Sequence, residues 1–253
     1  MKKIILSVVI GIVVLVVVAV VVIGLNLDSA IKKGVETYGP EFTKVSVKLD
    51  GVSLSILSGG GSIKGLVVGN PEGFATPHAI KVDKASLSVS PGSVFSDKIV
   101  IKSIRVEGPE INFETGLTGG DNLHKILDNV TAATGGPSTN KASGPGKKLQ
   151  VDDFVLTGAR VNVSVKGTGG AAAPIILPDI HLSNLGQGPE GITPGELTKK
   201  IISEVTTEVA KASVKVVADI SKGAVKAAGD VGKGATDAAG KAVKGVTDLF
   251  KKK

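Results

Sequence analysis

The residues best suited to chemistry in this sequence are three histidines and one adjacent pair of carboxylates. His78, His124 and His181 lie in different segments, and none has a partner at metal-ligand spacing, such as a second histidine four residues on. Asp152 and Asp153 are neighbours, and neighbouring side chains on a strand point to opposite faces, which disfavours an acid–base pair. We therefore expect surface histidines and edge charges, with no catalytic residue, no cofactor and no metal site.

Composition excludes several further classes of function. The chain of 253 residues has no cysteine, which excludes disulfides and thiolate metal sites. Gly59-Gly60-Gly61 lacks the Gly-Lys-Ser/Thr that follows in a phosphate-binding loop, so we expect a turn or bend there. Aromatic residues make up only 3% of the chain, too few for base-stacking platforms. We therefore expect a protein that is not an enzyme and does not bind nucleic acid.

Residues 1–27 predict a transmembrane signal anchor. The stretch from Ile4 to Leu25 carries no charge and no proline, and as a helix it would be about 33 Å long, enough to cross a hydrocarbon core of roughly 30 Å. Lys2 and Lys3 precede it, which places the N-terminus in the cytoplasm and the rest of the chain in the periplasm. A cleaved signal peptide is the alternative, but its apolar core is typically about 7–15 residues.

Residues 28–130 form the first predicted β segment. A short helix over 28–38 should end at Gly39-Pro40, and apolar and polar residues then alternate, with turn signals about every 8–12 residues. This pattern predicts antiparallel strands with one apolar face. A change of alternation predicts a bulge near Asp83-Lys84. The segment closes with a helix over 121–130, begun by Asp121 or Asn122, that covers part of the apolar face.

A linker or long loop over 131–148, rich in Gly, Pro, Ser and Thr, separates a second β segment over 149–188. Its alternation predicts a register shift near Asp152-Asp153, a hairpin turn at Gly158-Ala159, and an edge or bend at Pro178. Neither segment has enough apolar residues to close its own core, so we expect both to build one sheet.

Three stretches resemble AsmA-like proteins, which are membrane-anchored periplasmic proteins of Gram-negative bacteria. They are VSLSILSGGGSIKGLVVGNPEGF (52–74), the strands with a turn at Glu107-Gly108-Pro109, and GGDNLHKILDNV (119–130). The resemblance covers about residues 1–185. It implies a repeating β-groove, that is, a curved sheet with an apolar concave face, associated with phospholipid movement and outer-membrane integrity.

A long amphipathic helix is predicted over 194–253. Thr193 and Glu196 form a capping box around Pro194, and one apolar stripe follows, made of Leu197, Ile201, Val205, Val209 and Ala212. An 11-residue repeat over 213–223, 224–234 and 235–245 resembles those of apolipoprotein-like and late-embryogenesis-abundant proteins.

The end of this helix predicts contact with a membrane surface. Leu249 and Phe250 would be its apolar tip, with Lys251, Lys252 and Lys253 at anionic headgroups. A solvated basic tail and pairing with other copies are the alternatives.

These features predict an α+β fold: an N-terminal transmembrane helix, a curved antiparallel β-sheet with a short covering helix, and a long C-terminal amphipathic helix. The expected function is non-enzymatic lipid binding or transfer, or outer-membrane biogenesis, at the inner membrane. The alternative is a scaffold that self-associates, or binds envelope proteins, through its sheet edges or C-terminal helix. The candidate groove lining is Leu54, Ile56, Val67, Leu87, Ile101 and Ile111. These residues could equally be plain core under a helix over 194–218.

Overall fold

The computed structural model describes residues 28–228, apart from 56–57, 117–119, 136–146 and 167–171. The predicted anchor and the tail beyond residue 228 lie outside the described residues. The chain begins with a helix over 28–43. The further elements are β1 (Val47–Lys48), β2 (Gly51–Leu54), β3 (Gly60–Val68), β4 (Ile80–Val89), η1 (Pro91–Phe95), β5 (Lys98–Glu107), β6 (Glu110–Thr115), α2 (Asn122–Gly135), β7 (Lys148–Thr157), β8 (Arg160–Val165), β9 (Ala172–Ile176), β10 (Ile180–Leu185) and α3 (Pro194–Ala228).

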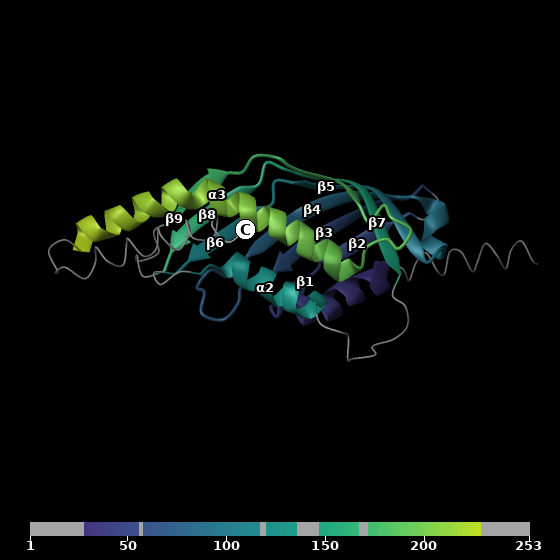
Figure 1. The fold of residues 1–253 in the computed structure, drawn as a ribbon, viewed down its shortest axis with the longest axis horizontal. Helices are drawn as coiled ribbons and strands as arrows, with labels where there is room; N and C mark the ends of the chain where they lie inside the picture. Colours follow the sequence, from purple (N-terminus) through teal and green to yellow (C-terminus); the bar gives the residue numbers. More distant parts are fainter. Residues whose placement is uncertain (1–27, 56–57, 117–119, 136–146, 167–171, 229–253) are drawn as a thin grey trace, which may run out of the picture.

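All ten strands form one curled sheet, a half-barrel, with α3 crossing in front of it (Figure 1). Both predicted β segments belong to this sheet, as expected. Short strands follow one another end to end, so that β1–β2, β5–β6, β7–β8 and β9–β10 each act as one long strand. The register shows this continuity: β5–β6 pairs with β7–β8 at a constant offset, from Lys98 with Lys148 to Thr115 with Val165.

One transverse row of residues crosses every long strand, and we call it the kink row. It contains Asp50, Gly65, Asp83, Gly108, Gly158 and Pro178, the positions left between the paired residues of neighbouring strands. Gly65, Gly108 and Gly158 have φ angles of +61°, +59° and +61°, in the left-handed region that glycine adopts most readily. These glycines let neighbouring strands bend at the same place.

The kink row corrects two predicted turns. Gly158-Ala159 was expected to be a hairpin turn, and Glu107-Gly108-Pro109 the turn of a strand pair. In the structure the chain continues forward at both places, because β6 and β8 pair with each other rather than folding back on β5 and β7. At Asp83-Lys84 the alternation changes as predicted, with Val82 and Ala85 both buried, but the register with β3 is unbroken, so there is no bulge against that strand.

The fold is α+β as predicted, but the sheet is mixed rather than antiparallel. The β5–β7 and β6–β8 pairs are parallel. The reason is the connection: α2 and the segment after it carry the chain back, so that 148–165 runs beside 98–115 in the same direction. Near Asp152-Asp153 the alternation changes, since Val151 and Phe154 are both buried in the core, but the pairing register with β5 and β10 is unbroken, so the predicted register shift is absent.

Two predicted helix starts are confirmed by their hydrogen bonds. Asp121 caps α2, because its Oδ1 accepts from the His124 backbone N–H at 2.8 Å. The Thr193–Glu196 capping box begins α3: the Thr193 N–H donates to Glu196 Oε2 at 2.8 Å, and the Glu196 N–H donates to Thr193 Oγ1 at 3.1 Å. Leu197, Val205 and Val209 are buried in the core, as the apolar stripe predicts.

Helix lengths differ from the predictions at several ends. The first helix runs through Gly39-Pro40 to residue 43. The predicted linker is shorter, because α2 continues to Gly135 and β7 starts at Lys148. Within the described residues, α3 contains the first 11-residue repeat and the start of the second, and the rest of the predicted helix lies outside them. Among the described residues, no helix combines the length and apolarity needed to span a membrane.

Candidate functional site

The sheet carries a continuous apolar face, which we call the concave face. Cross-strand partners share a face, so the register identifies its members. Pairings run from Leu54 through Gly61, Leu87, Ile104 and Phe154 to Leu182. Beyond the kink row, Ile80, Ile111 and Val161 continue the same face. The helices α2 and α3 pack on this side, and their apolar residues share its core.

The distal half of the concave face is closed. We use this name for the part beyond the kink row, formed by β1, β6, β8, β9 and the adjoining ends of β3 and β4. Phe113, Val161 and Val163 are 0% exposed, beneath α3 and beside α2. Leu123 and Ile126 of α2 and Val209 of α3 are equally buried. This half is an ordinary hydrophobic core.

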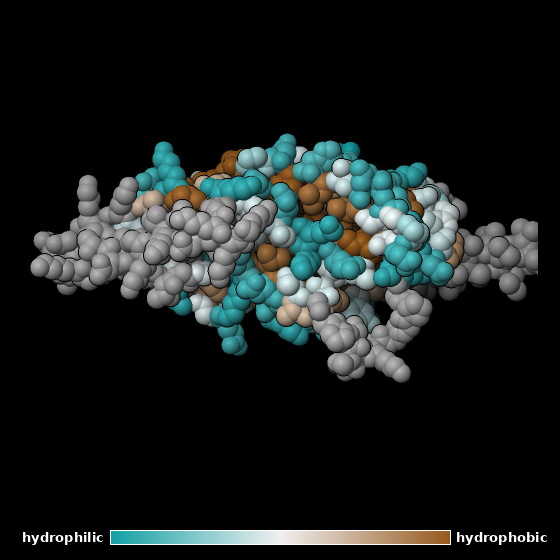
Figure 2. All heavy atoms as spheres, in the orientation of Figure 1, coloured by the Kyte–Doolittle hydropathy of each residue, from teal (hydrophilic) through white to brown (hydrophobic). Residues whose placement is uncertain are grey.

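The proximal half, formed by β2, β5, β7, β10 and the other ends of β3 and β4, is only partly closed. Eight of its apolar side chains are half-buried, although they share the face of the distal core, whereas others on that face, such as Val151 and Phe154, are buried. We call these eight residues the open region: Val52, Leu54, Ile63, Leu87, Ile101, Ile104, Leu182 and Leu185. Figure 2 shows an apolar band beside α3, over the area where Figure 1 labels β3 to β5.

Glycine shapes this open region. A Cβ on Gly61 would lie 2.9 Å from Leu54 Cδ1 and 3.2 Å from Leu87 Cδ1. The leucines of β2 and β4 therefore meet over a bare backbone on β3, and this hollows the face between them. The sequence analysis expected a bend at Gly59-Gly60-Gly61, but Gly60 and Gly61 are strand residues.

The described residues of the predicted groove lining divide into three groups. Leu87 and Leu54 lie in the open region, and so does Ile101, which is paired with Val89. Ile111 lies on the same face but is 1% exposed, in the distal core. Val67 is on the opposite face with its partners Lys48 and Lys81. Ile56 is outside the described residues, as are Leu249, Phe250, Lys251, Lys252 and Lys253.

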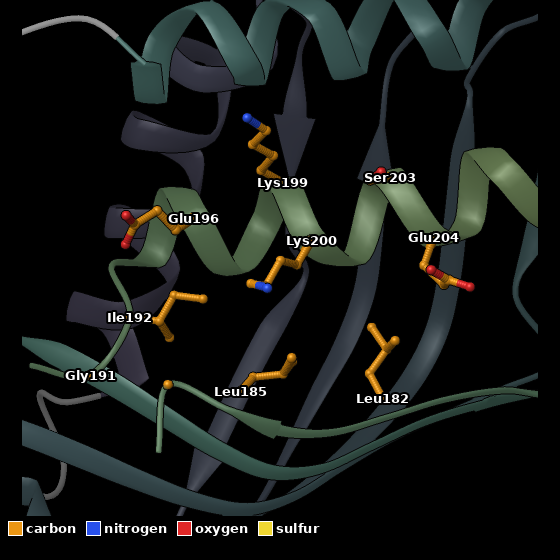
Figure 3. A pocket seen from close by; sticks show the side chains of 10 residues that line it. Leu182, Leu185, Gly191, Ile192, Glu196, Lys199, Lys200, Ser203 and Glu204 are labelled. Atoms are coloured by element: carbon orange, nitrogen blue, oxygen red, sulfur yellow. The ribbon is translucent and has the colours of Figure 1, made fainter. Parts of the chain in front are cut away.

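A cleft of about 670 Å³ separates α3 from β10 at the edge of the open region (Figure 3). Leu182, Leu185 and Ile192 form its apolar floor, and the first turns of α3 form its roof. Lys200 points toward this floor, whereas Lys199 points away from it (Figure 3). The cleft thus joins an apolar surface to a charged helix.

The charged residues of this cleft differ in whether they have a hydrogen-bond or ion-pair partner. Hydrogen bonds from the Thr193 backbone and hydroxyl hold the pKa of Glu196 below its usual range. Its carboxylate is therefore occupied in capping α3. Within the described residues, Lys200 and Glu204 have no hydrogen bond or ion pair. One cation and one anion therefore remain available at the edge of the apolar floor.

A buried polar network joins the three stretches on which the family resemblance rests. Asn122 Nδ2 donates to Asn70 Oδ1 at 2.8 Å and to the Asn112 carbonyl at 2.7 Å, and its Oδ1 accepts from the Glu114 N–H at 3.0 Å. Glu114 accepts from the backbone N–H groups of Ala75 and Thr76. We call this network the latch. It fixes the loop after β3 to β6 and α2, so these motifs serve structure.

The chemically capable residues form no reactive constellation among the described residues. Asp153 meets Arg105 and His181 at the surface, and Asp152 accepts from Gln150. His124 Nδ1 lies 2.7 Å from Asp121 Oδ2; burial alone would lower its pKa, but the hydrogen bond and charge of Asp121 raise it. Within the same residues, no group of three His, Asp or Glu side chains could hold a metal ion.

Sequence reasoning missed the floor and roof of the cleft. Leu182 and Leu185 lie in a predicted strand, but nothing in their spacing shows that they face Lys200. Leu182 and Leu185 lie on one face although they are three residues apart, so the alternation of the strand changes between them. Asn184 could have signalled this change, because asparagine tolerates a positive φ, and the φ of Asn184 is 61°.

Comparison with known proteins places the chain in a family. A family model described as the AsmA family matches residues 1–169, which include the latch and the sheet through β8. Neither a search of curated proteins nor a search of solved structures gave a significant match. The match covers more than half of the chain, so the protein belongs to the AsmA family, whose members are associated with the membrane and the cell envelope.

Proposed function

We propose that this protein is a non-enzymatic envelope protein whose concave face shelters the acyl chains of membrane lipids. The carrying observation is the open region: eight apolar residues on one face that α2 and α3 leave only partly buried. Exposed contiguous apolar surface on a folded domain generally marks an interaction site. An acyl chain fits it because an extended hydrocarbon needs no hydrogen-bond partners.

The cleft supports an amphiphilic ligand rather than a purely apolar one. Leu182, Leu185 and Ile192 would hold hydrocarbon, while Lys200 and Glu204 lie where polar headgroup atoms would emerge. Burying an unpaired headgroup charge in the distal core would be costly. The proposed lipid therefore lies in the proximal half, with its head toward α3.

The proposed setting is the inner membrane, with the sheet in the periplasm. It rests on the predicted anchor at 4–25 and the positive-inside distribution around it. Lipid transfer and a part in outer-membrane biogenesis are the processes in which such a groove would serve, and the family assignment supports an envelope role.

Photo-crosslinking tests the proposal. A benzoylphenylalanine at position 87 of the full chain should give lipid adducts, identified by mass spectrometry after mild extraction from native membranes. Val67 is the matched control, because it lies on the neighbouring strand and the opposite face. If position 87 gave no lipid adduct, or if both positions gave the same yield, the acyl-chain proposal would be wrong.

Self-association through sheet edges is the competing function, and the structure disfavours it at one edge. The first helix lies along β1–β2 and accepts from two backbone N–H groups of this edge. Asp28 Oδ1 accepts from the Leu54 N–H at 2.9 Å, and Glu36 Oε1 accepts from the Leu49 N–H at 3.1 Å. Such coverage blocks pairing with another strand. A monomer in light scattering at all concentrations would exclude this alternative.

A further inference from the structure

The largest exposed aromatic surface in the described residues is Phe95, at the end of η1. Its exposed fraction is 70%, compared with 47% for Tyr38 and 66% for Ile176. Isolated exposed apolar residues are common and need no explanation by themselves. Phe95 differs because its turn is held in place and because of where that turn lies.

Hydrogen bonds order the η1 turn. Ser93 Oγ donates to the Ser90 carbonyl at 2.7 Å and accepts from the Val100 N–H at 2.9 Å. Lys147 Nζ donates to the Val94 carbonyl, which ties the turn to the start of β7. The phenyl ring is therefore presented to solvent by a fixed backbone.

The η1 turn lies at the same end of the sheet as the start of the described chain. Asp28 bonds the Leu54 N–H, and the next N–H, of Ser55, donates to the Gly60 carbonyl at 2.8 Å. A Cβ on the adjacent Gly59 would lie 3.2 Å from Pro91 Cδ. Asp28 and η1 are thus separated by about two strand spacings, roughly 10 Å.

The predicted anchor ends at Leu25, three residues before Asp28. A chain spans at most about 3.6 Å per residue, so Asp28 would lie within about 11 Å of the hydrocarbon boundary. The headgroup layer itself is roughly 5–8 Å deep on each side. This end of the half-barrel would therefore face the bilayer surface.

We propose that the Phe95 turn docks on the membrane that holds the anchor. The phenyl ring enters the interfacial layer, as amphipathic and aromatic residues do at that depth. Lys98 and Lys147 flank the turn, with Asp97 between it and β5. Their ammonium groups donate to the carbonyls of Gly188 and Val94, and each has two further N–H donors that would meet lipid phosphates. Docking would turn the proximal half toward the bilayer, so that an acyl chain could pass into the open region. The inference rests on the proposed anchor and groove.

Fluorescent labelling of the full chain in liposomes tests the docking. The chain lacks cysteine, so Ser96→Cys and Ile176→Cys each give one labelling site. Ser96 is exposed beside Phe95, and Ile176 is exposed and paired with Arg160, two residues beyond the kink row in the distal half. An environment-sensitive dye at 96 should be blue-shifted and quenched by spin-labelled lipid. The same dye at 176 should be quenched by aqueous iodide instead.

A second substitution separates docking from mere proximity. Phe95→Ser in the Ser96→Cys background should lose the blue shift and the lipid quenching. If positions 96 and 176 responded alike to both quenchers, or if Phe95→Ser changed neither signal, the docking proposal would be overturned. Release of the chain by alkaline carbonate would overturn its premise.

The two proposals can fail separately. Lipid quenching at position 96 without lipid adducts at position 87 would keep the docking and reject the groove. Lipid adducts at position 87 with a water-exposed position 96 would do the reverse.

Discussion

The two halves of the sheet carry the same kind of apolar face but bury it to different degrees. In the distal half, Ile111, Phe113 and Val163 are at most 1% exposed. In the proximal half, Leu87 and Ile101 remain half-buried on the same face, although Val151 and Phe154 near them are buried. The difference lies in the cover, since α2 contacts β6 and the main strand contact of α3 is with β8. Helix placement therefore decides which part is core and which is groove.

The largest predicted difference between the two halves is in the loss of stability when one large apolar side chain of each half is truncated to alanine. Phe113→Ala should destabilise the fold by about 3–5 kcal/mol, because it removes a fully buried ring and leaves a cavity. Leu87→Ala should cost roughly 1–2 kcal/mol, because a half-buried side chain loses less transfer free energy. Urea denaturation of both full-length variants measures the difference. Equal costs would contradict the division into core and groove.

Disrupting the latch should cause the second largest loss of stability. Asn122→Ala leaves the Glu114 N–H and the Asn112 carbonyl without their buried partner, and should cost about 2–4 kcal/mol. Gln187→Ala is the control, because it removes an exposed amide that bonds only Asn184. Thermal unfolding should show a large drop for Asn122→Ala and almost none for the control. A neutral Asn122→Ala variant would show that the network does not hold the distal half.

The kink row can be tested at Gly158, where the cost is purely conformational. A Cβ there meets only the Gly108 backbone N, at 4.0 Å, but φ is +61°. Gly158→Ala should destabilise by about 1–2 kcal/mol. Gly158→Asn should recover part of this, because asparagine tolerates the left-handed conformation. If both variants unfolded at the same denaturant concentration as the parent protein, strain at the kink row would be excluded.

The kink row also explains what could be predicted from the sequence. Alternation identified the strands, and the capping box and apolar stripe identified the start of α3. Gly108 and Gly158 look like turn residues locally, so collinear strands were interpreted as pairs joined by turns. The parallel pairing depends on a crossover through α2, which no local pattern reveals.

Val67 illustrates the same limit for the site. It was chosen by alternation, but Gly65 changes the phase of β3. Leu66 and Val68 therefore share the face of Val82 and Ile80, and Val67 does not. Likewise, alternation predicts an apolar face but not which helices cover it. Groove residues and core residues could therefore not be distinguished from the sequence, because this depends on where α2 and α3 lie on the sheet.

A smaller effect should appear with pH at the edge of the distal half. The Asp121 carboxylate raises the pKa of His124 above its ordinary value of 6.5 despite burial. The charged pair therefore stabilises the fold below the unfolded pKa, and this contribution is lost as pH rises through the folded pKa. We expect about 0.5–1 kcal/mol of stability to disappear over that range. His124→Gln should remove this part of the pH dependence. A pH profile identical in both proteins would contradict it.

A predicted effect of similar size has the opposite sign and concerns α3, which covers the sheet. Ser213 is 0% exposed in α3, and its hydroxyl has no hydrogen-bond partner in the described structure. Ser213→Ala removes a desolvated polar group and improves helix propensity, so it should stabilise by about 0.5–1 kcal/mol. Thr207→Ala is the comparison, because the Thr207 hydroxyl donates to the Ser203 carbonyl at 2.8 Å, and it should not stabilise.

The denaturant midpoints of both variants would measure these changes in stability. If Ser213→Ala were less stable than the parent protein, the Ser213 hydroxyl would have a hydrogen-bond partner, and the prediction would be wrong. Thr206 and Ser221 are buried and unpaired on the same helix. Such hydroxyls weaken the hold of α3 on the sheet relative to an all-apolar helix. If Ser213→Ala also lowered the yield of lipid adducts at position 87, tighter packing of α3 on the sheet would limit the access of lipid to the open region.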